Sequence, residues 1–146
     1  MCLRLQQTFG RIADARQWSK IPLIAPCDIT VYKVLDTVIE KKVKEYYSTH
    51  RSTQYREGET KEVSKFSFKI TSPYTRSGPW KLEINKGLHC FRKADSDAAD
   101  LLLQRKGAVL IKCIIPKGTH YFKNEETWEY VSLKLQMPNK FEDISK

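Results

Sequence analysis

The stretch that most constrains the fold of this chain is the run AVLIKCIIP at residues 108–116. Apart from Lys112 it is apolar throughout, and it is rich in β-branched residues. A strand with apolar side chains on both faces is typical of the interior of a sheet, where other layers cover each side. The run therefore predicts a sheet with strands on either side of this one. With 146 residues the chain is long enough to bury one such core.

Other segments alternate between apolar and polar residues, which predicts half-buried strands. In DITVYKVL, residues 28–35, the alternation places Ile29, Val31, Lys33 and Leu35 on one face. Short turn signals such as Gly58 separate the segments. The segments that we expect to form strands are 28–35, 61–71, 81–84, 87–91, 108–116 and 127–137.

Helical patterns are fewer. Residues 94–104, ADSDAADLLLQ, repeat apolar residues at helical spacing, and either Asp95 or Ser96 is suited to cap the first turn. A short amphipathic helix is expected within residues 1–20. The segment 36–51 fits a helical stripe or the two strands of a hairpin.

Together the patterns predict one α+β domain that spans residues 1–146. We expect a mostly antiparallel sheet of about five or six strands, with one central helix and one or two further short helices. The polar residues 138–146 are expected to form a loose tail.

The four cysteines show no CxxC pair, and no secretion signal precedes them, so we expect reduced thiols and a cytoplasmic protein. His89 and Cys90 are neighbours in GLHCF, residues 87–91, and neighbours on a strand point to opposite faces. They are therefore unsuited to bind one metal ion or to act as a catalytic pair. We expect His89 to be hydrogen-bonded in a buried strand, and Cys90 and Cys113 to be inert core thiols. No metal or other cofactor is expected, and no apolar run approaches the roughly 20 residues of a membrane span.

The net charge is +9, and cations alternate with aromatic residues in 46–56, 74–81 and 120–123. Tyrosine, tryptophan and arginine anchor protein interfaces, and they also stack on and neutralise single-stranded nucleic acid. The pattern predicts a basic-aromatic binding surface. The residues that we expect to form it are Lys41, Lys42, Lys44, Tyr47, Arg51, Tyr55, Arg56, Tyr74, Arg76, Trp80, Lys81, Arg105 and Lys106.

The order strand 87–91, acid-started helix 94–104 and strand 108–116 resembles the middle of ADP-ribosyltransferase-like folds. The resemblance implies a cleft near His89 that binds a nucleotide or an NAD-derived ligand. Such enzymes carry an arginine or histidine on the first core strand and a glutamate on a later one. Here ITVYKVL contains neither arginine nor histidine, and no glutamate stands in an ExE or QxE pattern, so catalysis is the less favoured alternative.

A second resemblance covers residues 28–137. The opening MCLRL, the segments DITVYKVL, GLHCF and VLIKCIIPKGTHYF, an SPY motif before a tryptophan and a final YVSLKL resemble a group of small uncharacterised proteins of Bacteroidota and their phages. The resemblance implies a phage or mobile-element accessory protein that inhibits a host defence nuclease, as anti-CRISPR proteins do. We therefore expect a non-enzymatic interaction protein, with a host protein or ribonucleoprotein as its partner and RNA as a further candidate.

Overall fold

The computed structural model describes residues 5–48, 53–71 and 79–145. Among these residues strands account for 51% and helices for 11%, so the protein is mostly β. The strands are β1 (Leu5–Phe9), β2 (Leu23–Ile24), β3 (Ile29–Glu40), β4 (Val43–Ser48), β5 (Gln54–Tyr55), β6 (Thr60–Glu62), β7 (Ser67–Thr71), β8 (Trp80–Lys86), β9 (Leu88–Phe91), β10 (Ala108–Ile115), β11 (His120–Asn124), β12 (Glu129–Ser132) and β13 (Lys134–Gln136). The helices are α1 (Ile12–Trp18) and α2 (Asp97–Leu103).

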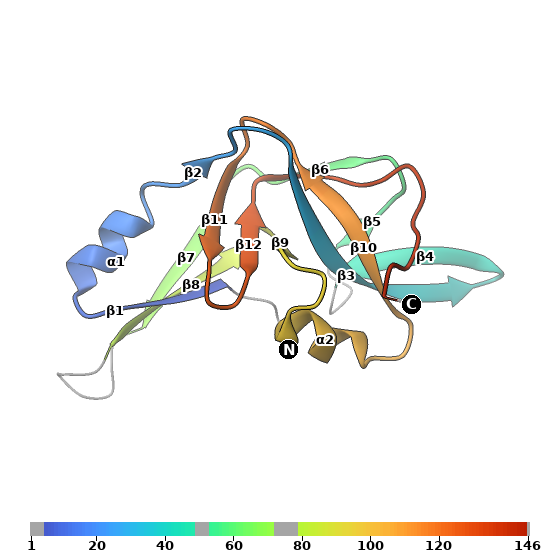
Figure 1. Cartoon of the computed structure of the whole chain (residues 1–146), viewed down its shortest axis with the longest axis horizontal. Helices are drawn as coiled ribbons and strands as arrows, with labels where there is room; N and C mark the ends of the chain where they lie inside the picture. Colours follow the sequence, from blue (N-terminus) through green and yellow to red (C-terminus); the bar gives the residue numbers. More distant parts are fainter. Residues whose placement is uncertain (1–4, 49–52, 72–78, 146) are drawn as a thin grey trace.

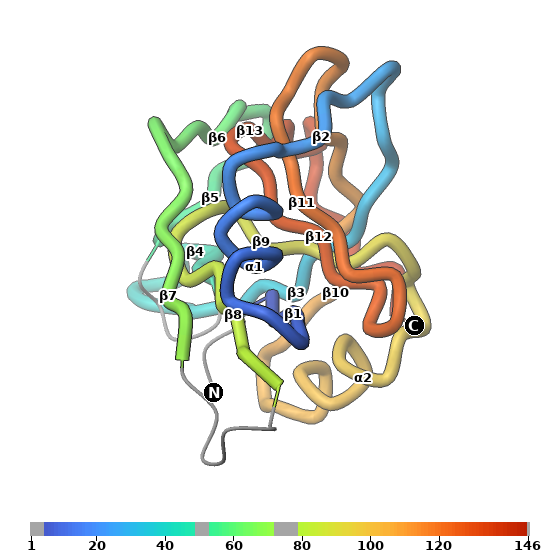
Figure 2. Tube along the Cα trace, turned by 90° about the vertical axis from the view of Figure 1, so that its left-hand side faces the viewer, coloured from blue at the N-terminus to red at the C-terminus, as the bar shows by residue number. Residues whose placement is uncertain are grey.

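The strands form two antiparallel sheets. A ten-stranded sheet curls into a half-barrel in the order β2-β11-β12-β9-β3-β10-β13-β6, with β4 and β5 continuing beside β3 (Figure 1). A three-stranded sheet, β1-β8-β7, lies at the α1 end of the molecule. Figure 2 looks at that end and shows α1 in front of the sheets.

The predicted fold class, an α+β domain with five or six strands, is therefore wrong. Four segments explain the difference. The ambiguous segment after residue 35 is the hairpin of β3 and β4, and part of the expected N-terminal helix is β1. The expected strand 61–71 is divided between β6 and β7, and 127–137 is divided between β12 and β13.

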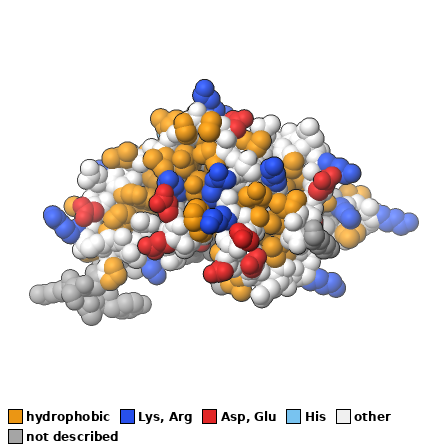
Figure 3. Space-filling model, viewed as in Figure 1, with side chains coloured by type: hydrophobic (Ala, Val, Ile, Leu, Met, Phe, Trp, Pro, Cys, Tyr) orange, Lys and Arg blue, Asp and Glu red, His pale blue; other side chains and the backbone are white. Residues whose placement is uncertain are grey.

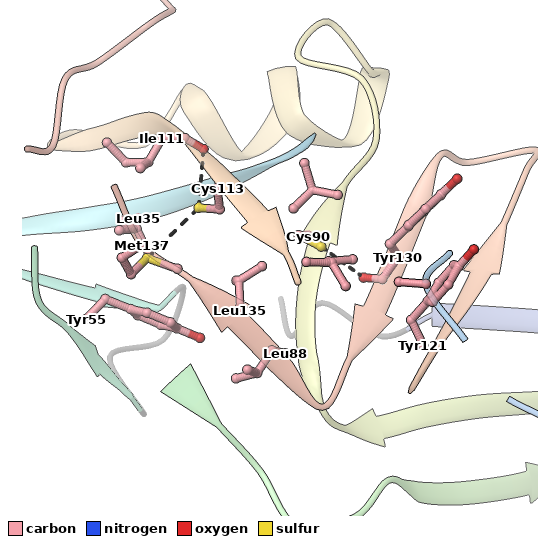
Figure 4. Close-up of a cluster of buried hydrophobic side chains, with 13 residues drawn as sticks. Leu35, Tyr55, Leu88, Cys90, Ile111, Cys113, Tyr121, Tyr130, Leu135 and Met137 are labelled. Atoms are coloured by element: carbon pink, nitrogen blue, oxygen red, sulfur yellow. Dashed lines mark hydrogen bonds between the residues drawn. The ribbon is translucent and has the colours of Figure 1, made fainter. Parts of the chain in front are cut away.

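The strand predicted to be central, β10, pairs with β3 along its whole length, from Ala108 opposite Asp36 to Ile115 opposite Ile29. Alternate side chains of these strands point to opposite faces. One face of the curled sheet holds the largest buried cluster, which includes both buried cysteines (Figure 4). The opposite face packs on α2 through Phe91 and on the three-stranded sheet through Phe122.

Two local predictions can be compared with the structure. Ser96 is the N-cap of α2, because its hydroxyl accepts a hydrogen bond from the Ala99 amide at 3.3 Å. The tail is not loose along its described length. The Asp143 carboxylate accepts a bond from the Leu110 amide at 3.1 Å, and Phe141 packs edge-on against Tyr46 at 4.6 Å.

Candidate interaction surface

The hairpin of β3 and β4 extends beyond the half-barrel (Figure 1). Its pairing runs from Leu35 opposite Ser48 to Glu40 opposite Val43. β10 leaves β3 at Asp36, and β5 pairs with β4 only at residues 46 and 47. Within the described part of the chain, residues 38–45 therefore pair only with one another. We call these residues the arm.

Two exposed aliphatic side chains lie near the tip of the arm. Ile39 is 66% exposed and Val43 is 57% exposed. Residues that face each other across a ladder share a face, so Ile39 lies beside Lys44 and Val43 lies beside Glu40 on the opposite face. Each face of the arm thus carries one aliphatic side chain that the protein itself does not bury.

The turn of the arm consists of Lys41 and Lys42, both in the left-handed region with φ values of 50° and 66°. Two-residue hairpin loops require this conformation, and asparagine and glycine adopt it more easily than lysine. With Lys44 the arm carries three lysines and two glutamates. Figure 3 shows basic, acidic and apolar side chains together at this projecting end.

At the base of the arm a buried carboxylate is paired with a cation. Asp36 is 5% exposed, and its Oδ2 lies 3.0 Å from the guanidinium of Arg105. The other oxygen of Asp36 is buried without a hydrogen-bond partner. On the same face the Tyr47 hydroxyl donates to the Glu45 carboxylate, and this hydrogen bond raises the pKa of Tyr47.

The structure brings together some of the residues expected to bind and separates others. Lys41, Lys42 and Lys44 lie on the arm, and Tyr47, Arg105 and the exposed Lys106 lie at its base. Arg56 is exposed just after β5, close enough to influence the Tyr47 hydroxyl. Trp80 and Lys81 begin β8 in the other sheet. Arg51, Tyr74 and Arg76 lie outside the described residues.

Tyr55 is placed differently from what a binding anchor requires. It is 2% exposed, and its ring contacts two cations, with Lys33 Nζ at 5.2 Å and Lys61 Nζ at 5.7 Å from the centroid. The ring therefore supports the core and the neighbouring lysines.

Lys33 is a buried charge that the sequence analysis did not single out. It is 4% exposed, and its Nζ donates to the carbonyl of His89 at 2.6 Å. β3 and β9 pair only at Tyr32 and Phe91, so the His89 carbonyl faces β3 where the ladder has ended. The Lys33 ammonium supplies the hydrogen bond that the ladder does not provide at this carbonyl. The signal in the sequence was a lysine on the apolar face of the strand 28–35.

The GLHCF segment is a buried strand, as expected, with His89 and Cys90 on opposite faces. The His89 ring donates from Nε2 to the Ile84 carbonyl at 2.9 Å, and burial lowers the pKa of His89 to about 4. Burial also raises the pKa of the Cys90 thiol, and that of Cys113 to about 12. His89 does not line any of four surface cavities formed by described residues, so these four do not provide the ligand cleft of the alternative site.

Glu129 is the carboxyl group whose pKa is most perturbed toward neutrality. Burial raises its pKa to about 7, and its Oε2 has no hydrogen-bond partner. Its ladder neighbours are Phe91 and Asn124, and the Asn124 amide is already bonded to the Gln6 carbonyl. Among the described residues no three His, Cys, Asp or Glu side chains are placed to hold a metal ion.

No family model matches this chain, and neither a curated protein nor a solved structure was found that is similar to it. Over the described ranges, the chain forms no helix of the length and apolarity that a membrane crossing requires. The arm exposes two aliphatic side chains and a lysine turn, which are suited to binding.

Proposed function

We propose that the protein is a non-enzymatic binding protein that inserts its arm into a groove of a protein partner. The observation that carries this proposal is the pair of exposed aliphatic side chains, Ile39 and Val43, on opposite faces of an otherwise unpaired hairpin. A surface that touches a partner on one side needs apolar residues on one face only. Apolar residues on both faces suit a partner that encloses the tip.

The charges of the arm favour protein over RNA as the primary contact. Nucleic-acid binding depends on cations that neutralise phosphates. Here Glu40 and Glu45 offset two of the three lysines of the arm. Buried aliphatic contacts with a rim of charges are instead typical of protein interfaces.

The buried polar groups fit a binding function better than a catalytic one. A nucleophilic cysteine needs a lowered pKa and an accessible thiol, whereas Cys90 and Cys113 are buried with raised pKa values. The His89 ring is engaged by a backbone carbonyl. These features support structural roles for all three residues.

The expected context is a prediction that rests on the resemblance to phage and Bacteroidota proteins. We expect the protein to act in the cytoplasm, and we expect its partner to be a host defence nuclease of the CRISPR type. A partner groove with carboxylates opposite the turn of the arm would complement Lys41 and Lys42.

Capture from a lysate of the host bacterium tests the proposal. The immobilised chain is compared with Ile39→Ser/Val43→Ser, and with Leu101→Ser as a control, because Leu101 is 51% exposed on α2, far from the arm in sequence. We expect the wild type and the control to retain one host protein equally, with or without nuclease treatment, and the arm variant to retain at least roughly tenfold less.

Two results would contradict the proposal. Equal retention by the arm variant would show that the tip does not carry the contact. Loss of the captured protein after nuclease treatment would show that RNA, and not protein, is the primary contact. Circular dichroism of each variant excludes misfolding as the cause of a loss.

A further inference from the structure

A cavity of about 730 Å³ lies at the α1 end of the molecule, between α1, β1 and the end of β11. Its aromatic lining comes from Phe122, which is 2% exposed, and from Trp18, whose ring centroid is 4.7 Å from that of Phe122. Phe9 stands 6.0 Å from Trp18. The exposed side chains of Ile21 and Leu23 form an apolar edge of the cavity. We call this feature the N-terminal cavity.

The N-terminal cavity is electronegative although the chain as a whole is basic. Asp14, Glu125 and Glu126 line it together with one cation, Lys123, so the lining carries a net charge of −2 against +9 for the chain. Lys123 is already bound to Glu125 at 2.8 Å. The charges of Asp14 and Glu126 therefore set the local potential, which favours a cationic ligand with an apolar body.

The arm has the complementary chemistry. Its aliphatic side chains match the aromatic lining, and its lysines match the carboxylates at the rim. In the described part of the chain seven large hydrophobic side chains are exposed, and five of them belong to these two features or adjoin them. The five are Ile21, Leu23 and Ile24 at the cavity side, and Ile39 and Val43 on the arm.

We propose that the N-terminal cavity of one copy of this chain receives the arm of a second copy. The inference rests on the proposed role of the arm as the binding element, and it names one partner for it. The arm and α1 lie at opposite ends of the long axis (Figure 1), so an arm is directed away from its own cavity. Two elongated copies that lie antiparallel bring each arm to the cavity of the other, which closes the assembly as a dimer.

Sedimentation velocity over a roughly hundredfold range of protein concentration tests this proposal, because mass action makes self-association depend on concentration. Two charge-reversal variants are compared with the wild type. Lys41→Glu/Lys42→Glu makes the arm acidic, and Glu125→Lys/Glu126→Lys makes the rim of the cavity basic. Lys65→Glu/Lys69→Glu is the matched control, since both lysines are exposed away from the arm and the cavity rim.

We expect the wild type and the control to dimerise, and each reversed variant alone to associate at least roughly tenfold more weakly. An equimolar mixture of the two reversed variants should dimerise again, because the acidic arm fits the basic rim and the basic arm fits the acidic rim. Recovery in the mixture also shows that both variants are folded.

A wild type that stays monomeric over the whole range would overturn the inference, and so would a mixture that fails to associate. These results separate it from the proposed function. A monomer that still captures a host protein through Ile39 and Val43 refutes self-association alone, whereas arm variants that change neither capture nor association refute both.

Discussion

His89 joins three strands through two different groups. Its ring binds the Ile84 carbonyl of β8, its own carbonyl accepts the ammonium of Lys33 on β3, and its backbone continues β9. Protonation would place a second positive charge beside Lys33 in a buried position. Burial first, and then the charge of Lys33, hold the pKa of His89 at about 4, below its ordinary value of 6.5, against the opposing effect of the bond to Ile84.

The shifted pKa of His89 predicts a loss of stability in acid. The unfolded chain binds a proton near pH 6.5 and the folded chain only near pH 4, so stability that is fully present above pH 6.5 is lost as the pH falls through this window. The expected loss is about 3 kcal/mol. Urea unfolding of His89→Asn should show a lower free energy of unfolding at pH 7.5, with a gap to the wild type that narrows toward pH 4. Parallel pH curves for the two proteins would contradict this account. The titration of Glu129 affects both proteins equally, so it does not contribute to the difference between their free energies of unfolding.

At the scale of the element, the turn of the arm keeps two lysines where the backbone favours other residues. A left-handed conformation costs a non-glycine residue roughly 1–2 kcal/mol. The preference of the backbone and the identity of the residues therefore disagree at Lys41 and Lys42, and such disagreements are typical of functional sites.

The variant Lys41→Asn/Lys42→Gly separates the backbone conformation of the turn from its positive charge. The variant should slow hydrogen exchange of the paired amides of β4 by a factor that corresponds to about 1 kcal/mol, because the new residues favour the turn. It should also weaken self-association and partner capture, because two cations are lost. Lys41→Gln/Lys42→Gln, which removes the charges without easing the turn, should weaken binding without slowing exchange. Unchanged exchange in the Asn-Gly variant would mean that the lysine turn is not strained.

At the scale of the whole molecule, the sequence predicts individual strands better than the way in which they assemble. Alternation found β3, a continuous apolar run found β10, and the cap at Ser96 was correctly among the alternatives for α2. The alternating pattern did not show where the expected strands 61–71 and 127–137 are interrupted. Val63 packs on the core of the half-barrel and Phe66 on the core beside the three-stranded sheet, so the chain leaves one sheet and enters the other between them. Such a change of partner depends on contacts between distant residues, which local periodicity does not record.

The candidate site was predicted in part for the same reason. The lysines of the arm were among the residues expected to bind, because the chain is strongly basic. The hairpin was one of two alternatives for 36–51. The aliphatic pair was missed, because Ile39 and Val43 fit a buried stripe equally well until the pairing of β3 is known. Lys33 carried a local signal, as a cation on an apolar face, but its acceptor lies 56 residues further along the chain.

The two sheets meet around Phe122, and this contact decides whether the molecule unfolds as one unit. The ring of Phe122 on β11 lies 4.7 Å from Trp18, 4.9 Å from Phe66 and 5.5 Å from Phe68, so it joins α1 and the β7 side to the half-barrel. Phe122→Ala should lower the free energy of unfolding by about 3–5 kcal/mol, because the lost contacts leave a cavity between the sheets.

Urea unfolding followed by tryptophan fluorescence and far-ultraviolet circular dichroism measures this effect. We expect both signals to shift together to lower urea, since residues from both sheets share the buried cluster around Phe122. Leu101→Ala, at an exposed position on α2, should change stability by no more than about 0.5 kcal/mol. If the fluorescence changed at lower urea than the circular dichroism, the three-stranded sheet with α1 would be a separate folding unit, and the expectation of a single domain over residues 1–146 would be wrong.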